Sequence, residues 1–288
     1  MQQPRPYDMS VQRKIWKKED KIISERNKKL KQTTICAHMS NLNIIHGDCL
    51  DLLKNIPDKS VDLILVDPPY GTTACKWDII IPFEPIWKEI KRIRKDKAAA
   101  LIFGTEPFSS LLRTSNIENF KYDWVWEKSH PKGHLNANKQ PLRAHEIVSV
   151  FYDNNYYPQK TSGHVLKQAN NNDRSKKQTM LYGKQKGITS YSSTERFPRS
   201  VIKFKADTQK ENYHPTQKPV ALLEYFIKTY SSENDTVLDF AMGSGSAGIA
   251  CQNLKRHFIG IEKNKEFFDI AEGRLSRHAF QESDLTNK

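Results

Sequence analysis

Two apolar segments that run directly into turn-forming residues constrain the fold of this chain more than any other feature. Residues 61–66 (VDLILV) lead into DPPYG, and residues 236–238 (TVL) lead into DFAMGSGS. A strand that is apolar at successive positions is buried on both faces, which is typical of a parallel sheet covered by helices. Both segments are therefore predicted to be inner strands of an α/β sheet.

Strands and helices alternate around these two segments. A strand at NIIHGD and a helix at DCLDLLKNI precede residues 61–66, and a helix at FEPIWKEIKRIRK follows them. Further strands are predicted at 98–104, 122–126 and 146–152, and a helix that begins near Pro219 precedes the second apolar segment. This alternation predicts a doubly wound, mostly parallel sheet that binds ligands at the carboxyl ends of its strands.

The excess positive charge is concentrated in one segment. The chain carries a formal net charge of +13, and residues 127–205 contain 15 Lys and Arg against 5 Asp and Glu. Tyrosines at positions 152, 156, 157, 182 and 191 lie among these basic residues. Such a surface can contact phosphates and stack bases, so nucleic acid is the expected partner. A long flexible loop is the alternative.

These observations divide the chain into four parts. Residues 1–40 form a basic N-terminal extension, which is either a solvated arm or one that touches DNA or a second copy. Residues 41–126 and 206–280 form the catalytic domain, 127–205 an inserted region and 281–288 a tail. The four cysteines show no metal-binding or disulfide spacing, and no apolar run reaches the roughly 18 residues of a membrane span. We therefore expect a cytoplasmic protein without a metal site.

The glycine-rich turn predicts a ligand that contains adenosine. It comes directly after a strand and opens a helix, so its backbone can approach a ligand closely and offer free N–H groups. Glu262 stands at the end of the next strand, where an acid can accept hydrogen bonds from both ribose hydroxyls. A nicotinamide dinucleotide is the main alternative ligand.

The segment Asp67-Pro68-Pro69-Tyr70-Gly71 predicts a catalytic template. Consecutive prolines make a rigid bend and leave carbonyl groups available as acceptors. The Asp67 carboxylate beside a proline carbonyl gives two acceptors for an amino group, and Tyr70 offers a face on which a base can stack. In isolation, a Pro-Pro turn with a capping Asp would explain the pattern equally well.

Together, DPPY and DFAMGSGS resemble the motifs of the amino-group DNA methyltransferases. DPPY precedes the glycine motif, with HPTQKP (214–219) between them, which is the permuted order of the β class. The resemblance implies a Rossmann-like fold that depends on S-adenosylmethionine, and it makes residues 127–205 the target-recognition region.

The resemblance also implies roles for individual residues. Asp67, Pro68, Pro69 and Tyr70 would be catalytic. Asp48, with Cys49 beside it, would lie near the cofactor's adenine and Glu262 near its ribose, although Asp48 can equally be a helix N-cap. Thr216 and Lys218 would lie near the methionyl carboxylate. The residues expected around the methionyl part are Asp239, Phe240, Ala241, Gly243, Ser244 and Gly245.

The implied activity is methyl transfer to the N6 amino group of adenine in duplex DNA, by direct in-line attack from a flipped base. Methylation of cytosine at N4 is the main alternative, although related N4 enzymes more often carry Ser in place of Asp67. RNA or protein-amide methylation and a catalytically silent DNA-binding protein are further alternatives. The expected setting is bacterial or phage, and a homodimer and a cognate restriction endonuclease are the further partners that the resemblance raises.

Overall fold

The computed structural model describes residues 42–73, 75, 77–169, 178–179, 183–184, 191–205 and 217–286. Contacts divide the chain into Met1–His38 and Met39–Lys288, and every described residue belongs to the second unit. The predicted N-terminal extension and Thr216 lie outside the described residues.

The strands and helices follow the predicted alternation. The main sheet contains β1 (Leu42–His46), β2 (Val61–Val66), β3 (Arg94–Gly104), β4 (Phe120–Lys132), β5 (Arg143–Phe151), β10 (Val201–Phe204), β11 (Thr236–Asp239) and β12 (His257–Glu262). Two small sheets pair β6 (Lys167–Ala169) with β9 (Tyr191–Ser193) and β7 (Gln178–Thr179) with β8 (Gly183–Lys184). The helices are α2 (Cys49–Leu52), α3 (Phe83–Ile93), α4 (Phe108–Thr114), α5 (Val220–Tyr230), α6 (Ser246–Asn253) and α7 (Lys265–Thr286), with 3₁₀ turns η1 (Leu53–Asn55) and η2 (His134–Asn136).

The eight strands of the main sheet lie in the order β1-β12-β11-β2-β3-β5-β4-β10. Strand β5 is antiparallel to both of its neighbours, and the other pairs are parallel. After β11 the chain passes through α6 to β12, in one direction along the strand order. After β2 it passes through α3 to β3, in the other direction. The carboxyl ends of β2 and β11 therefore meet at a switch point, where open α/β sheets bind their ligands.

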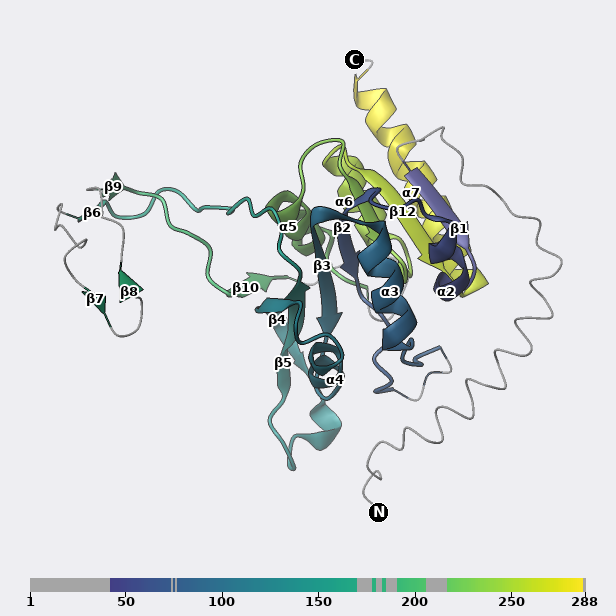
Figure 1. Ribbon diagram of the computed structural model, residues 1–288, viewed down its shortest axis with the longest axis horizontal. Helices are drawn as coiled ribbons and strands as arrows, with labels where there is room; N and C mark the ends of the chain where they lie inside the picture. Colours follow the sequence, from purple (N-terminus) through teal and green to yellow (C-terminus); the bar gives the residue numbers. More distant parts are fainter. Residues whose placement is uncertain are drawn as a thin grey trace. The chain divides into compact units, whose positions relative to one another are not determined.

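Helices cover both faces of the sheet, and α3 crosses the near face in Figure 1. Alternate residues of the same strand belong to different cores: Leu63 and Leu65 pack with α5 and α6, while Ile64 and Val66 pack with α2, α3 and α4. Because successive side chains of a strand point to opposite faces, a strand buried on both sides must be apolar throughout. The mostly parallel, doubly wound sheet predicted from the sequence is confirmed.

The main sheet extends into the predicted insertion. Strand β4 crosses the expected boundary at residue 126, and β5 and β10 lie wholly within 127–205. Trp124, Trp126, Val148 and Val150 of β4 and β5 all join the core that α5 covers. Among the described residues between β5 and β10, 152–169, 178–179, 183–184 and 191–200 lie outside the main sheet. At the other end of the chain, α7 continues through the start of the expected tail to Thr286.

Candidate active site

The loop after β2 is held by its own side chains. Asp78, which is 8% exposed, accepts hydrogen bonds from the backbone amides of residues 71–73 at 2.8, 2.9 and 2.7 Å. Gly71 has a φ of 66°, and a Cβ there would lie 2.9 Å from Cγ1 of Ile80. The loop therefore needs glycine at this position. The sequence analysis did not predict this role of Asp78, which lies seven residues after Gly71.

The Asp67 carboxylate, whose side chain is 24% exposed, is the centre of a largely buried ionic network. Tyr70 donates its hydroxyl to Oδ1, and Nζ of Lys218 binds Oδ2. The Lys218 ammonium, 6% exposed, also lies 3.2 Å from Oε2 of Glu146, whose Oε1 is paired with Lys128. Four charged residues from the β2 loop, β4, β5 and the segment before α5 are thereby joined.

Burial and charge act against one another in this network. Burial raises the pKa of Asp67, the Lys218 ammonium lowers it, and the nearby Glu146 carboxylate raises it, with a net upward shift. Burial alone would lower the pKa of Lys218, but the carboxylates of Asp67 and Glu146 raise it overall. Lys218 therefore stays protonated and provides a fixed positive charge against Asp67.

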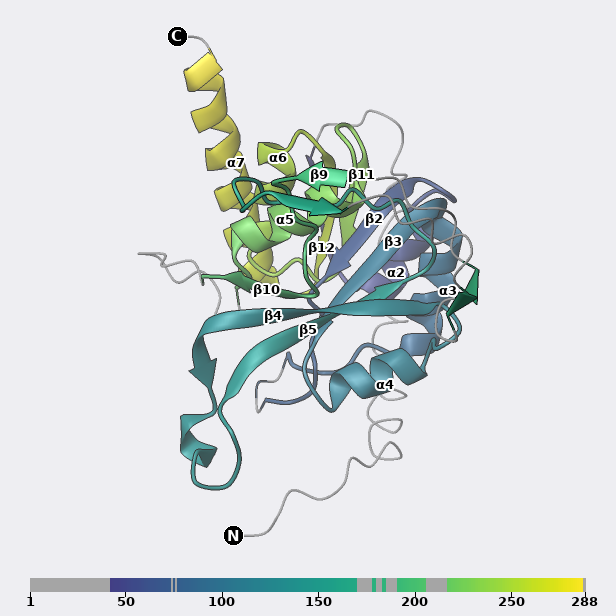
Figure 2. The ribbon, with the colours of Figure 1, turned by 90° about the vertical axis from the view of Figure 1, so that its left-hand side faces the viewer.

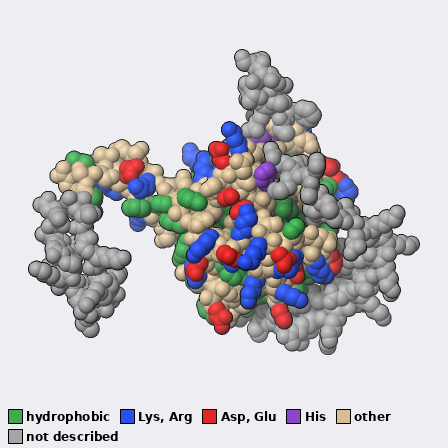
Figure 3. Space-filling model, turned by 45° about the horizontal axis from the view of Figure 1, so that its top comes forward, with side chains coloured by type: hydrophobic (Ala, Val, Ile, Leu, Met, Phe, Trp, Pro, Cys, Tyr) green, Lys and Arg blue, Asp and Glu red, His purple; other side chains and the backbone are tan. Residues whose placement is uncertain are grey.

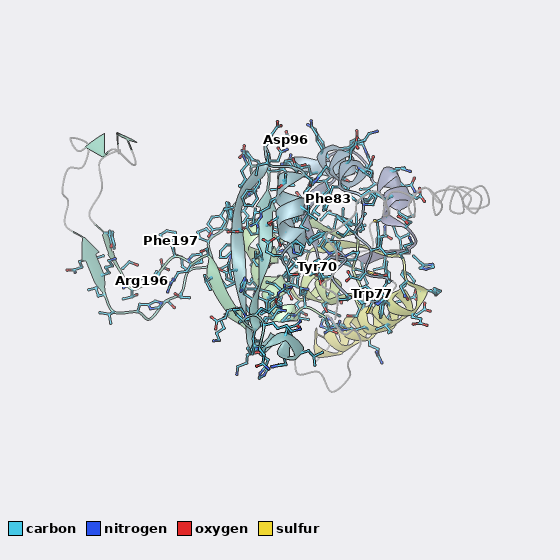
Figure 4. The ribbon with its side chains drawn as sticks, turned by 90° about the horizontal axis from the view of Figure 1, so that it is seen from below. Tyr70, Trp77, Phe83, Asp96, Arg196 and Phe197 are labelled. Carbon is cyan, nitrogen blue, oxygen red and sulfur yellow. The ribbon has the colours of Figure 1, made fainter. Side chains whose placement is uncertain are left out.

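Tyr70 combines a polar contact with an aromatic one. Its ring lies 5.1 Å from that of Phe108 between centroids, and Nζ of Lys218 lies 5.8 Å from the Tyr70 ring centroid. Burial and the Asp67 charge both raise its pKa, so the hydroxyl remains a donor. Figure 4 looks onto this edge of the sheet from below and shows Tyr70 within it, with Trp77 toward α7.

The loop after β11 is the predicted glycine turn. Gly243 and Gly245 both have positive φ, 53° and 78°. A Cβ at Gly245 would lie 3.2 Å from Cβ of Ala271, so glycine allows α7 to pack against the turn. Glu262, at the end of β12, accepts hydrogen bonds from the amides of Gly243 at 2.9 Å and Asn264 at 2.7 Å. The structure thus brings the turn and the downstream acid together.

Asp239 is a buried acid that lacks a cationic partner within the described part of the chain. It is 5% exposed, and its Oδ1 accepts one hydrogen bond, 3.0 Å from the Ala241 amide. Burial, partly opposed by that hydrogen bond, raises its pKa to about 8, and the charges of Asp67 and Glu262 add to the rise. The Lys218 charge lowers this pKa by less than the other effects raise it, so the carboxyl is predominantly protonated at neutral pH.

The other expected cofactor residues lie around these loops. Asp48 caps α2, since its side chain accepts from the Leu50 amide at 2.9 Å, and it also pairs with Lys263 at 3.0 Å. The N-cap interpretation of Asp48 is therefore correct, and it leaves a role toward the cofactor as a prediction. Cys49 is buried, which raises its thiol pKa to about 12 and makes it a poor nucleophile.

Met242 points away from the turn into the core. Its sulfur would lie 2.4 Å from a Cβ at Gly260, so the bulky side chain occupies the space that this glycine leaves. Phe240 is buried on the opposite face of the sheet, with the core under α2 and α3. Ser244 hydroxyl donates to Oε1 of Gln217 at 3.3 Å, which links the glycine turn to the segment that carries Lys218.

Three further charged residues of the site had not been predicted. Glu146 and Lys128 continue the buried faces of β5 and β4, two residues before Val148 and two after Trp126. Charged residues at such inward positions are the signal that could have identified them. Arg274 of α7, 9% exposed, donates to the backbone oxygen of Ser244 at 3.1 Å and to Oγ of Ser246 at 3.0 Å.

This set of groups suits an adenosine-containing cofactor that also carries an ammonium group. Glu262 can accept from ribose hydroxyls beside the turn, and Asp239 offers a buried carboxyl for a cation. The glycines alone are less specific, because Gly243, Gly245 and Gly248 also match the dinucleotide spacing.

Comparisons with known proteins separate these alternatives. Residues 61–273 match the family model described as DNA methylase, N6_N4_Mtase. The chain is 30% identical over 266 residues to Type II methyltransferase M.HinfI of Haemophilus influenzae, covering 81% of this chain and 67% of that protein.

Solved structures agree with the family match. The M1.HpyAVI–SAM complex superposes with a TM-score of 0.57 at 26% identity, covering 81% of this chain and 98% of that one. The cytosine-N4-specific PvuII DNA methyltransferase shares the fold, with a TM-score of 0.58 at 17% identity, covering 82% and 86% of the two chains. Since the family match includes both the Asp67 loop and the glycine turn, the chain belongs to the amino-group DNA methyltransferases.

Proposed function

We propose that this chain transfers a methyl group from S-adenosylmethionine to the N6 amino group of adenine in a short sequence of duplex DNA. The observation that carries the proposal is the Asp67 carboxylate at the end of β2, charge-compensated by Lys218 and followed by two prolines. The fold, the family and the glycine turn support methyl transfer from this cofactor to an amino group of DNA.

Asp67 and the Pro68 carbonyl act as hydrogen-bond acceptors for the amino group. The lone pair of an aromatic amino nitrogen is delocalised into the ring, so the nitrogen must become more tetrahedral before it can attack. Two acceptors aimed at its hydrogens favour that geometry. Each Asp67 oxygen already accepts one bond, from Tyr70 or Lys218, and retains a second lone pair.

Lys218 keeps Asp67 in its acceptor form. A protonated Asp67 would present a donor to the amino group, so the reaction requires the carboxylate. The resemblance also places this lysine near the cofactor's carboxylate. Because its ammonium already contacts both Asp67 and Glu146, we propose that its principal role is to fix the charge of Asp67.

Asp239 and Glu262 hold the cofactor. When bound, S-adenosylmethionine supplies an electrophilic methyl group on a sulfonium centre. Asp239 would accept hydrogen bonds from its ammonium, and Glu262, which lies beside the glycine turn, would accept hydrogen bonds from the ribose hydroxyls. The thiols of Cys49 and Cys251 are buried with raised pKa values, which supports direct transfer without a covalent enzyme intermediate.

Tyr70 provides the stacking face for a base that has left the duplex. Extrusion of a paired base costs a few kcal/mol of stacking and pairing, which aromatic contacts in the pocket partly offset. The segment 152–200, between β5 and β10, is our candidate for reading the DNA sequence. A homodimer and a restriction endonuclease partner remain predictions.

Among the described residues, no helix has the length and apolar character of a membrane span.

Single-base mapping of methylation would test the proposal. The protein is expressed in a methylation-free bacterial host, beside an Asp67→Ala variant as the matched control. We expect N6-methyladenine at one defined motif in the first strain and at none in the second. N4-methylcytosine would instead favour the cytosine alternative. An absence of any modified base, or an active Asp67→Ala enzyme, would contradict the proposal.

A further inference from the structure

Strands β4 and β5 continue beyond the rest of the sheet as a hairpin (Figure 2). We call residues 129–145 the β4–β5 hairpin. Strands β3 and β4 are both antiparallel to β5, so β4 runs in the same direction as β3 and its parallel neighbour β2. The hairpin follows the carboxyl end of β4 and therefore leaves the sheet at the edge that holds Asp67. It is therefore placed where a DNA target must approach.

The β4–β5 hairpin has an unusual charge distribution. Its 17 residues contain no Asp or Glu, but they contain Lys132, Lys139, Arg143 and three histidines. Lys132 lies opposite Arg143 in the ladder, at the point where the hairpin leaves the sheet. A partner rich in negative charge matches this arrangement.

The opposite edge of the sheet shows the contrast. Two lysines there are paired with acids: Lys95 with Asp62 at 2.8 Å, and Lys121 with Asp153 at 2.9 Å. Figure 3 turns the upper part of Figure 1 toward the viewer and shows Lys and Arg side chains intermixed with Asp and Glu. The edge near Asp67 thus combines the catalytic loop with a hairpin free of acids.

The tip of the hairpin is folded and presents an apolar side chain. Backbone hydrogen bonds from Asn136 to Gly133 (2.9 Å), Ala137 to His134 (3.1 Å) and Lys139 to Asn136 (2.8 Å) form the turn that contains η2. Leu135 in this turn is 101% exposed, which is more than any other large apolar residue of the described chain. An ordered turn that exposes one leucine resembles the apolar wedges that enter DNA between stacked bases.

We propose that the β4–β5 hairpin enters the duplex beside the target base and that Leu135 occupies the stacking position which the extruded base leaves. Lys132, Lys139 and Arg143 hold the flanking phosphates. This inference rests on the proposed function. It assigns the hairpin to base extrusion and leaves the reading of sequence to other parts of the chain.

Single-turnover methylation of two duplexes tests the wedge. Both oligonucleotides carry the motif mapped as above; in one the target base is correctly paired, and in the other it is mispaired and already weakly held. The variants are Leu135→Ala and the control Ile117→Ala, which removes another exposed apolar side chain just before β4, at the far edge of the sheet. Thermal unfolding checks that both fold.

We expect Leu135→Ala to slow methylation of the paired duplex by about tenfold or more, because extrusion loses its stacking replacement. On the mispaired duplex its rate should return to within about threefold of the parent enzyme, because less stacking must be broken. Ile117→Ala should match the parent on both. Equal rates of Leu135→Ala and parent enzyme on the paired duplex, or an equal loss on both duplexes, would overturn the inference. A parent enzyme that methylates neither duplex would contradict the proposed function itself.

Discussion

Two loops at the same edge of the sheet each carry an aspartate, partly buried in one loop and buried in the other, and their surroundings differ. Asp67, after β2, is bound by the Lys218 ammonium, so its charge is balanced within the protein. Asp239, after the neighbouring strand β11, accepts one backbone hydrogen bond, and burial raises its pKa to about 8. Asp67 thus forms an ion pair with a lysine, whereas Asp239 forms none with the described residues.

This difference separates reaction from binding. A group that must accept hydrogen bonds in every turnover benefits from a permanent countercharge, which keeps it ionised. A carboxyl that receives a cationic ligand gains most if the ligand brings the missing charge. We therefore assign the β2 loop to the target amino group and the β11 loop to the cofactor.

The largest effect is expected at the first aspartate. Asp67→Asn retains the shape of the side chain but places an amide donor beside the target amino group. We expect the methylation rate to fall by at least about 10²-fold to 10³-fold, as when one preorganised polar group is removed from an active site. Cofactor affinity, measured by calorimetry, should change by less than about threefold. A large loss of cofactor affinity would erase the distinction between the loops.

Asp239→Asn should have the opposite profile. We expect cofactor affinity to fall by about tenfold or more, because the amide cannot balance an ammonium charge. Without cofactor, the Asp239→Asn variant should be more stable than the parent protein at alkaline pH. The folded pKa of Asp239 lies above the ordinary value, so the parent protein loses stability as the pH rises from about 4 to about 8. Asn has no proton to lose, so the variant avoids this loss.

Thermal unfolding at several pH values without cofactor measures this effect. The advantage of Asp239→Asn over the parent protein should grow between pH 4 and pH 8. A variant that is less stable than the parent at pH 8 would contradict the assignment of an uncompensated buried charge.

Glu146→Gln should produce the smallest effect and the most specific one. Glu146 holds Lys218 and raises the pKa of Asp67, so its removal should lower that pKa. We expect a rate reduced by about tenfold or less and an acidic limb of the pH–rate profile that moves to lower pH.

The control is Glu127→Gln, which removes an exposed ion pair with Lys203 one strand away. Exposed pairs contribute little, so its pH profile should remain unchanged. A slower Glu146→Gln enzyme with an unshifted acidic limb would indicate a structural role alone.

The sequence predicts the two loops well because each follows a strand that is buried at all of its apolar positions. VDLILV and TVLD have no other stable location than inside the sheet, and DPPYG and the glycine turn must follow at its edge. The direction of β5 could not be predicted in this way. Its apolar run is compatible with either direction, and the short hairpin before it, which replaces a crossover helix, makes it antiparallel.

The ionic network could be predicted only in part. Glu146 and Lys218 lie far apart in the sequence and come together because β5 packs near the β2 loop, a long-range arrangement that local patterns do not contain. The inward register of Glu146 on a buried strand face could have marked it as a paired acid. Its partner depends on the sheet order.

Proton release on cofactor binding tests the central contrast most directly. Titrations of S-adenosylmethionine at pH 7, in buffers of different ionisation enthalpy, report how many protons leave the complex. We predict release of about one proton by the parent enzyme, since Asp239 ionises when it receives the cofactor's cation, and none by Asp239→Asn. Binding by the parent enzyme without proton release, or undiminished release by Asp239→Asn, would contradict the account.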